Sequence, residues 1–229
     1  MSKKYDYDDL CEIIDTLLGE GGCPWDRAQT HESLKTCLLE ECYEVLDAID
    51  QKNNAGLCEE LGDVLLQVVF HGKLAEKHNE FTKLDITDGI CRKLINRHPH
   101  IFESPEALSA DTVLENWEEI KKREKGIESV TESMRLVPRH LPQSMRAAKL
   151  IKKAEKGGLA VSSEERSIAE IGELLARFPQ NNAEKSEVLG DILFEIANIA
   201  YVNQINAEFA LTNAIEKFIN RFESFERRS

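Results

Sequence analysis

The sequence predicts an all-α protein that contains two tandem helical-bundle repeats, the second of them degenerate. Apolar residues recur at helical spacing along most of the chain, and alternating strand patterns are scarce. With 229 residues, 41% of them hydrophobic, the chain can bury a substantial core. Short segments of the first half also recur in the second. We expect helices near 5–18, 31–50, 55–78, 85–97, 111–125, 143–156, 164–177, 183–205 and 207–226.

Glycine and proline mark the breaks between these helices. Gly21-Gly22-Cys23-Pro24 separates the first helix from the second, and His98-Pro99-His100 ends the fourth. Asp111 is expected to cap the fifth helix at its N-terminus. A stretch with two prolines then follows and is the best linker candidate. The predicted organisation is an N-terminal repeat at 1–125, a linker at 126–142 and a C-terminal repeat at 143–229.

The two halves share three segments in the same order and at nearly constant separation. Such agreement is hard to obtain by chance, so duplication of one unit is the simplest explanation. The pairs are E-E-C-Y-E at 40–44 with A-E-I-G-E at 169–173, E-L-G-D-V-L-L at 60–66 with V-L-G-D-I-L-F at 188–194, and K-L-I-N-R at 93–97 with K-F-I-N-R at 217–221.

The first repeat carries five acids in the pattern E-E-x-x-E … E-x-x-D. They are Glu40, Glu41 and Glu44 in one helix, and Glu60 and Asp63 in the next. Side chains three residues apart lie about 60° apart around a helix, so each pair can point into one space. Converging carboxylates repel one another unless a cation lies among them. Hard oxygen ligands of this kind suit Mg²⁺, which proteins hold with a few carboxylates, waters and substrate phosphates.

The helical wheel ranks the acids of the first cluster. Glu41 and Glu44 lie beside the apolar face of their helix, whereas Glu40 lies on the far side and is the weakest ligand candidate. A run of acids in a helix is often only a solvated face. For Glu40 and Glu41 taken alone, that interpretation explains the sequence equally well.

The second acid cluster is harder to explain as a solvated face. The segment 61–70 is apolar nearly all round, a pattern typical of a buried helix. Glu60, Asp63 and Gln67 are its polar exceptions, and they fall on one stripe. Unpaired buried carboxylates are costly, so this stripe predicts a metal or cationic partners.

The bulk composition excludes several classes of function. Net charge is −13 and the pI is about 5.0, which argues against nonspecific binding to nucleic acid or to an anionic membrane. No apolar run reaches transmembrane length, and the first ten residues lack the apolar core of a signal peptide. The six cysteines contain no C-x-x-C pair. We therefore expect a cytoplasmic protein with reduced cysteines.

Together, these motifs resemble the MazG family of nucleoside triphosphate pyrophosphohydrolases, in the all-α NTP pyrophosphatase superfamily. The resemblance covers nearly the whole chain. Its motifs are G-C-P-W-D (22–26), L-E-E-C-Y-E-V-L-D-A-I (39–49), E-E-L-G-D-V-L-L-Q-V-V-F (59–70), R-H-P-H-I-F (97–102), W-E-E-I-K (117–121) and L-P-Q-S-M-R-A-A-K (141–149).

The resemblance implies hydrolysis of an NTP or dNTP to the monophosphate and pyrophosphate. It also implies Mg²⁺ as the divalent cation, with Mn²⁺ left open as an alternative, and a homodimer or higher homo-oligomer. Either Glu40 or Glu44 is expected to be the general base. The implied metal ligands are Glu41, Glu44, Glu60 and Asp63, and the implied nucleotide contacts are Lys93, Arg97, Trp117 and Lys121.

The second repeat has lost part of this set. Ala169 stands where the first repeat has Glu40, and Val188 stands where it has Glu60. We therefore expect the working site in 1–125 and a folding or assembly role for the second repeat. Three alternatives remain: a dUTP-, dCTP- or phosphoribosyl-ATP-type pyrophosphatase, a carboxylate-bridged di-iron bundle, or a nucleotide-binding assembly protein without turnover.

Overall fold

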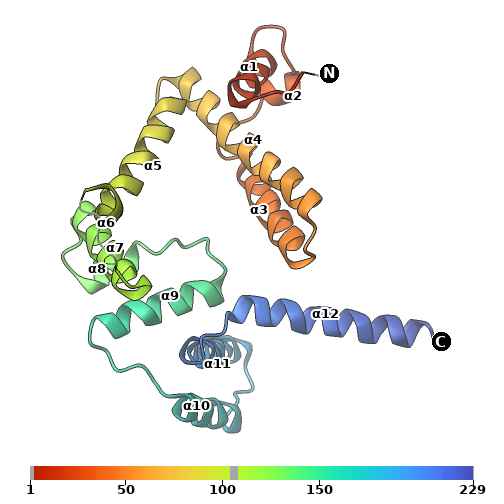
Figure 1. Ribbon diagram of the computed structural model, residues 1–229. Coiled ribbons are helices and arrows are strands. Elements are labelled where there is room, and N and C mark those ends of the chain that lie inside the picture. Colours follow the sequence, from red (N-terminus) through yellow and green to blue (C-terminus); the bar gives the residue numbers. More distant parts are fainter. Residues whose placement is uncertain (1–2, 104–107, 229) are drawn as a thin grey trace. The chain divides into compact units, whose positions relative to one another are not determined.

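The computed structural model describes residues 3–103 and 108–228, which form helices and no strand. Figure 1 labels these helices along the chain. The all-α prediction is confirmed. The helices are α1 (Tyr7–Leu18), α2 (Pro24–Arg27), α3 (Lys35–Asp50), α4 (Asn54–His78), α5 (Lys83–Arg97), α6 (Pro99–Phe102), α7 (Ala110–Glu124), α8 (Val130–Arg135), α9 (Gln143–Lys156), α10 (Glu164–Ala176), α11 (Asn182–Val202) and α12 (Ala207–Glu226).

Local capping fixes several of the helix ends. Asp6 and Asp9 form a capping box at the start of α1, and Thr82 and Asp85 form another at the start of α5. The predicted break after α1 needs a glycine at position 22. A Cβ there would lie 2.2 Å from the backbone oxygen of Leu17, so only glycine fits the turn.

The prediction that Asp111 caps the fifth helix is wrong. α7 begins one residue earlier, at Ala110, so Asp111 lies inside its first turn. The cap is Ser109, whose Oγ accepts a hydrogen bond from the backbone N–H of Thr112 at 3.2 Å. An acid in the first turn still favours the helix, because it faces the positive end of the helix dipole.

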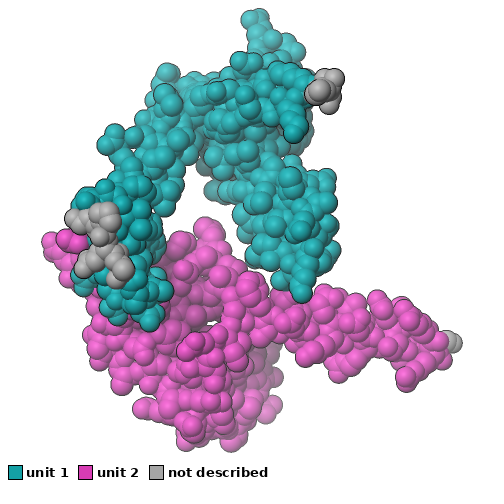
Figure 2. Space-filling view, viewed as in Figure 1, with its two compact units in different colours: residues 1–120 teal, residues 121–229 magenta. Residues whose placement is uncertain are grey.

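The chain divides into two compact units, 1–120 and 121–229, coloured separately in Figure 2. The boundary falls inside α7, a few residues before the predicted end of the first repeat. The predicted linker 126–142 contains a short helix, α8, which packs against α9. Ser133 of α8 and Val137 just after it are buried.

The core of unit 1 lies between α1 and the second half of α4. Its centre is formed by Ile14 and Leu18 of α1 and by Phe70 and Leu74 of α4, and Leu34 joins it from the segment before α3. α3 packs along the first half of α4. The acid-bearing half of α4 is therefore held by α3, and its other half is anchored in the core.

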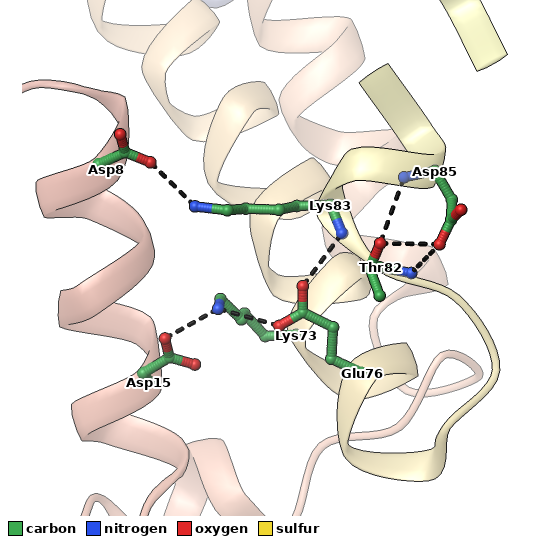
Figure 3. Close-up of polar contacts among 7 residues, drawn as sticks. All are labelled: Asp8, Asp15, Lys73, Glu76, Thr82, Lys83 and Asp85. Atoms are coloured by element: carbon green, nitrogen blue, oxygen red, sulfur yellow. Dashed lines mark hydrogen bonds and ion pairs between the residues drawn. The ribbon is translucent and has the colours of Figure 1, made fainter. Parts of the chain in front are cut away.

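An ion-pair network adds polar links among α1, α4 and α5 (Figure 3). Lys73 of α4 contacts Asp15 of α1 at 2.8 Å and Glu76 of its own helix at 3.0 Å. At the start of α5, Lys83 reaches Asp8 of α1 at 2.9 Å, and its backbone N–H donates to Glu76 at 3.0 Å. Lys73 thus links α4 to α1, and Glu76 links α4 to α5.

Unit 2 repeats the helix pairing of unit 1. In unit 1, α4 packs against α1, α3 and α5, and in unit 2, α11 packs against α9, α10 and α12. The acid-bearing segments of the first repeat and their counterparts occupy matching helices, α3 with α10 and α4 with α11. This arrangement is consistent with the tandem repeat.

The expectation that 61–70 is buried all round is wrong. Leu61, Leu65 and Val68 form a stripe on α4 that is 51%, 41% and 39% exposed. α3 covers another side of α4, and no further helix in the described part of unit 1 packs over this stripe. None of the helices in the described residues combines the length and apolarity needed to span a bilayer.

Candidate active site

Three of the predicted acids meet where α3 packs along α4. One carboxylate oxygen each from Glu41 of α3 and from Glu60 and Asp63 of α4 lie within 4.8 Å of one another. All three residues are partly buried. The three-residue spacing on α4 brings its two acids onto one side, and the packing of α3 brings Glu41 to meet them.

The two remaining acids of the pattern, Glu44 and Glu40, lie outside the cluster of three. Glu44 is exposed, and it lies near enough to Glu60 to help raise the pKa of that carboxyl. It therefore borders the cluster of three. Glu40 is also exposed, and it acts on the cluster only through its charge, as the weakest influence on Glu41.

The electrostatics of the cluster disfavour three bare carboxylates. Burial, and then the charges of Asp63, Glu44 and Glu40, raise the pKa of Glu41. Burial also raises the pKa of Glu60, with a further contribution from the neighbouring Glu44. Both shifts show that negative charge at this point is costly without compensation.

No cation compensates that charge among the residues that the structure describes. None of the ion pairs there joins Glu41, Glu44, Glu60 or Asp63 to a lysine, arginine or histidine. Oxygen ligands at this spacing fit a hard divalent ion such as Mg²⁺, which needs only one or two carboxylates together with waters and phosphates. The donor set also argues against the di-iron alternative, which requires Glu-x-x-His.

The predicted nucleotide contacts lie on α5 and α7. The guanidinium carbon of Arg97 lies 5.1 Å from the ring centroid of Trp117, a cation–π contact between the two helices. Lys93 is exposed one turn before Arg97, and Lys121 lies one turn after Trp117 on α7. Within the described part of unit 1, α5 packs against α4, which carries Glu60 and Asp63, and against α6, but not against α3, which carries Glu41.

The corresponding acids of unit 2 do not converge. Glu170 and Glu173 on α10 and Asp191 on α11 are all exposed. The only group of acids in the described residues with metal-ligand spacing is the one in unit 1. Val188, in place of Glu60, removes the carboxylate that would complete the second set.

Unit 1 also contains a histidine pair that the sequence did not predict. Nδ1 of His31 and Nδ1 of His71 lie 2.7 Å apart, and the two rings stack. His71 follows Gln67 by four residues, so it continues the polar stripe of α4, and this spacing is the one available signal. Its partner comes from the turn before α3, which helical periodicity does not place.

Comparisons with known proteins agree with the motifs. Residues 29–102 match the model of the MazG nucleotide pyrophosphohydrolase domain. The chain is 38% identical to the nucleoside triphosphate pyrophosphohydrolase/pyrophosphatase MazG of Thermotoga maritima, over 96% of this chain and 85% of that protein. It is 38% identical to the nucleoside triphosphate pyrophosphohydrolase of Escherichia coli, over 91% and 82%.

A further relative is considerably longer than this chain. The chain is 41% identical to the uncharacterized protein YabN of Bacillus subtilis over 97% of its own length, but it spans only 46% of that protein.

Proposed function

The chain belongs to the MazG nucleotide pyrophosphohydrolase family, and on that premise we propose that it hydrolyses nucleoside triphosphates, with ribose or deoxyribose, to the monophosphate and pyrophosphate in a Mg²⁺-dependent reaction. The observation that carries this proposal is the cluster of Glu41, Glu60 and Asp63. Its carboxylates converge, no ion pair within the described residues neutralises them, and the pKa values of Glu41 and Glu60 are raised.

In this proposal the acids have two roles, metal binding and proton transfer. Glu41, Glu60 and Asp63 would hold Mg²⁺ or Mn²⁺, and Glu44 would complete the set at its border. When bound, the cation neutralises charge on the phosphate oxygens in the transition state. Glu44 also lies near Glu60, whose pKa it raises, and is therefore better placed than Glu40 to take a proton from the water that attacks the α-phosphorus.

Binding of the nucleotide requires positive charge and a surface for the base. Lys93, Arg97 and Lys121 can pair with phosphate oxygens, and an indole such as that of Trp117 can stack on a base. The Arg97–Trp117 contact supports this assignment, because it holds a guanidinium and an aromatic face together.

The decisive experiment measures pyrophosphate release over all common NTPs and dNTPs, with dUTP, dCTP and phosphoribosyl-ATP included, in Mg²⁺, in Mn²⁺ and in excess chelator. We expect release that depends on the cation and that E60Q abolishes while the circular dichroism spectrum stays that of a folded helical protein. Wild-type protein that binds nucleotides without releasing pyrophosphate would instead identify a binding or assembly protein.

The exposed apolar stripes support association into a homodimer. Leu61, Leu65 and Val68 on α4 have counterparts 128 residues later in Leu189, Leu193 and Ile196 on α11, and all six are exposed. Apolar stripes of this length are normally covered. A second copy offers the same surface, so a symmetric dimer would cover it. Light scattering after gel filtration should give twice the chain mass of 26.0 kDa, and L65D should give a monomer.

A further inference from the structure

The polar stripe of α4 continues beyond the acids of the candidate site. Gln67 follows Asp63 by four residues, and Glu60, Asp63 and Gln67 fall within about 60° of one another around the helix. The segment between them is otherwise apolar. Gln67 is therefore the next polar side chain along the face that carries the acids.

Gln67 is buried without a hydrogen-bond partner. Only 7% of the residue is exposed, and its Oε1 is enclosed with no partner among the described residues. Enclosing a carboxamide oxygen in this way costs free energy, on the order of 1–3 kcal/mol, unless something else accepts or donates there. Leucine or methionine would fill the same volume without that cost.

Unit 2 shows how the same position is satisfied when the site is degenerate. Glu195 stands 128 residues after Gln67, and it accepts a hydrogen bond from the hydroxyl of Ser167 on α10. Ser167 is fully buried and also accepts from Asn198 Nδ2 at 2.9 Å. Its counterpart in unit 1, 129 residues earlier, is Leu38, which offers no hydrogen bond. Unit 1 therefore keeps a polar side chain at this position and lacks the internal partner.

Helix geometry directs the amide toward the acids. Long side chains on an α-helix lean toward its N-terminal end, over the turn before their own Cα. For Gln67 that is the turn of Asp63, about 6 Å away along the helix axis. The carboxamide turns about its last side-chain bond, so either its oxygen or its nitrogen can face that turn.

We propose that Gln67 is a positioning residue of the acidic site, where its carboxamide accepts a hydrogen bond from a water in the hydration shell of the divalent cation held by Glu41, Glu60 and Asp63. This inference rests on the proposed function. Mg²⁺ keeps several of its waters when proteins bind it, and groups that orient such outer ligands contribute to affinity. The missing partner of Gln67 is then supplied when the cation binds.

The test measures Mg²⁺ affinity by calorimetry on the full chain without nucleotide, so it does not depend on turnover. Q67M keeps the length of the side chain and removes its hydrogen bonds. We expect its Mg²⁺ affinity to fall about 10- to 100-fold, the usual effect of losing an outer-shell group. Q67E restores an acceptor oxygen and should recover most of the affinity. E195M changes the matching position in unit 2 and should leave the affinity unchanged.

The outcomes separate this role from simple core packing. If Q67M binds Mg²⁺ like the wild type and only unfolds at a higher temperature, Gln67 is an uncompensated core residue and the proposal is overturned. If E195M weakens Mg²⁺ binding as much as Q67M, the effect is not local, and the proposal is again overturned. If Q67M does not fold, L38S tests the proposal instead. This substitution gives Gln67 a hydroxyl partner like the one that Ser167 provides in unit 2. A Gln67 carboxamide bonded to that hydroxyl should no longer orient the water of the cation, so Mg²⁺ affinity should fall, and an unchanged affinity would contradict the proposal.

The proposed function can fail separately. Wild-type protein that releases no pyrophosphate with any nucleotide overturns the proposed activity. Wild-type protein that releases pyrophosphate, together with Q67M of unchanged Mg²⁺ affinity, overturns only the role of Gln67.

Discussion

Lys73 of α4 lies with its Nζ 2.8 Å from a carboxylate oxygen of Asp15 on α1. Only 10% of the lysine side chain is exposed, and Glu76 holds the same ammonium at 3.0 Å. Burial alone would lower the pKa of Lys73, but the hydrogen bonds that Lys73 donates to Asp15 and Glu76 outweigh it and raise the pKa. The charge therefore persists where α1 closes over α4, and it ties α1 to the helix that carries Glu60 and Asp63.

We expect K73M to lower the free energy of unfolding by about 1–3 kcal/mol, because it leaves Glu76 partly buried without its charged donor. Urea unfolding followed by circular dichroism measures the change. K77M is the matched control, since Lys77 is exposed on the same helix and forms none of the described ion pairs. Equal stability of the two variants would show that the ion pairs of Lys73 contribute nothing to stability.

Glu60 should oppose folding of the cation-free protein at neutral pH. Burial and the neighbouring Glu44 raise its pKa above the ordinary value of 4.5. A carboxyl with a raised pKa favours the folded state while it is protonated, and that contribution is lost as pH rises through the folded pKa. E60Q should therefore unfold at a higher temperature than the wild type at pH 7.5, and this difference should disappear near pH 4.

Adding Mg²⁺ should reverse the order of the two proteins at pH 7.5. A cation that binds only the folded state stabilises the wild type, and E60Q lacks one of its ligands. Thermal unfolding with and without Mg²⁺ measures both effects. If Mg²⁺ raises the unfolding temperature of E60Q as much as that of the wild type, Glu60 does not bind the cation.

The helices and the acid cluster could be predicted because both depend on local spacing. The predicted and observed bounds of α9 and α12 coincide, and Glu41, Glu60 and Asp63 meet as their three-residue spacings suggest. Each helix, and the pair Glu60 and Asp63, is set by residues within a few turns of one another, and the short connection between α3 and α4 lets Glu41 reach that pair.

The features that were missed depend on contacts between distant segments. The His31–His71 pair exists because the turn before α3 docks onto α4, forty residues away. The exposure of Leu61 and its neighbours depends on which helices pack over α4, and the apolar pattern is the same whether another helix or another copy covers them.

The helix α8 was missed for a different reason. It has six residues, which is too short for a periodic signal.

The histidine pair predicts a loss of stability at mildly acidic pH. The 2.7 Å bond between the two Nδ1 atoms needs one donor and one acceptor, so protonating both rings sets two donors against each other. Burial and the neighbouring His31 lower the pKa of His71 below 6.5. A lowered histidine pKa gives stability that is present above the unfolded pKa and is lost as pH falls toward the folded one.

Urea unfolding at pH 7.5 and 5.5 tests this prediction. Wild-type protein should be less stable at pH 5.5, and H71F should show a smaller difference between the two pH values. H78N is the matched control, because His78 is exposed on the same helix and should leave the pH dependence unchanged. If the stability of H71F depended on pH as strongly as that of the wild type, the His31–His71 pair would not be the cause of the loss at acidic pH.

Arg97 should contribute to nucleotide binding more than to folding. R97A removes the guanidinium that lies 5.1 Å from the Trp117 ring and that we assign to a phosphate. We expect KM for the preferred nucleotide to rise about tenfold, equivalent to about 1.4 kcal/mol, with little change in kcat. R92A is the control on the same helix, since Arg92 pairs with Asp88. A KM that rises equally in both variants would indicate a general loss of positive charge.

Activity should reside in the acids of unit 1 and not in their counterparts in unit 2. Glu44 lies near Glu60 and raises its pKa, whereas the position that matches Glu60 in unit 2 is Val188, so Glu173 has no carboxyl neighbour there. E44Q should therefore lower kcat at least 100-fold, the scale expected for a general base, while E173Q should change it less than twofold. Steady-state pyrophosphate release at saturating nucleotide and Mg²⁺ measures both. A large loss in E173Q with activity retained in E44Q would move the working site to unit 2, because the two substitutions differ only in the repeat that they alter.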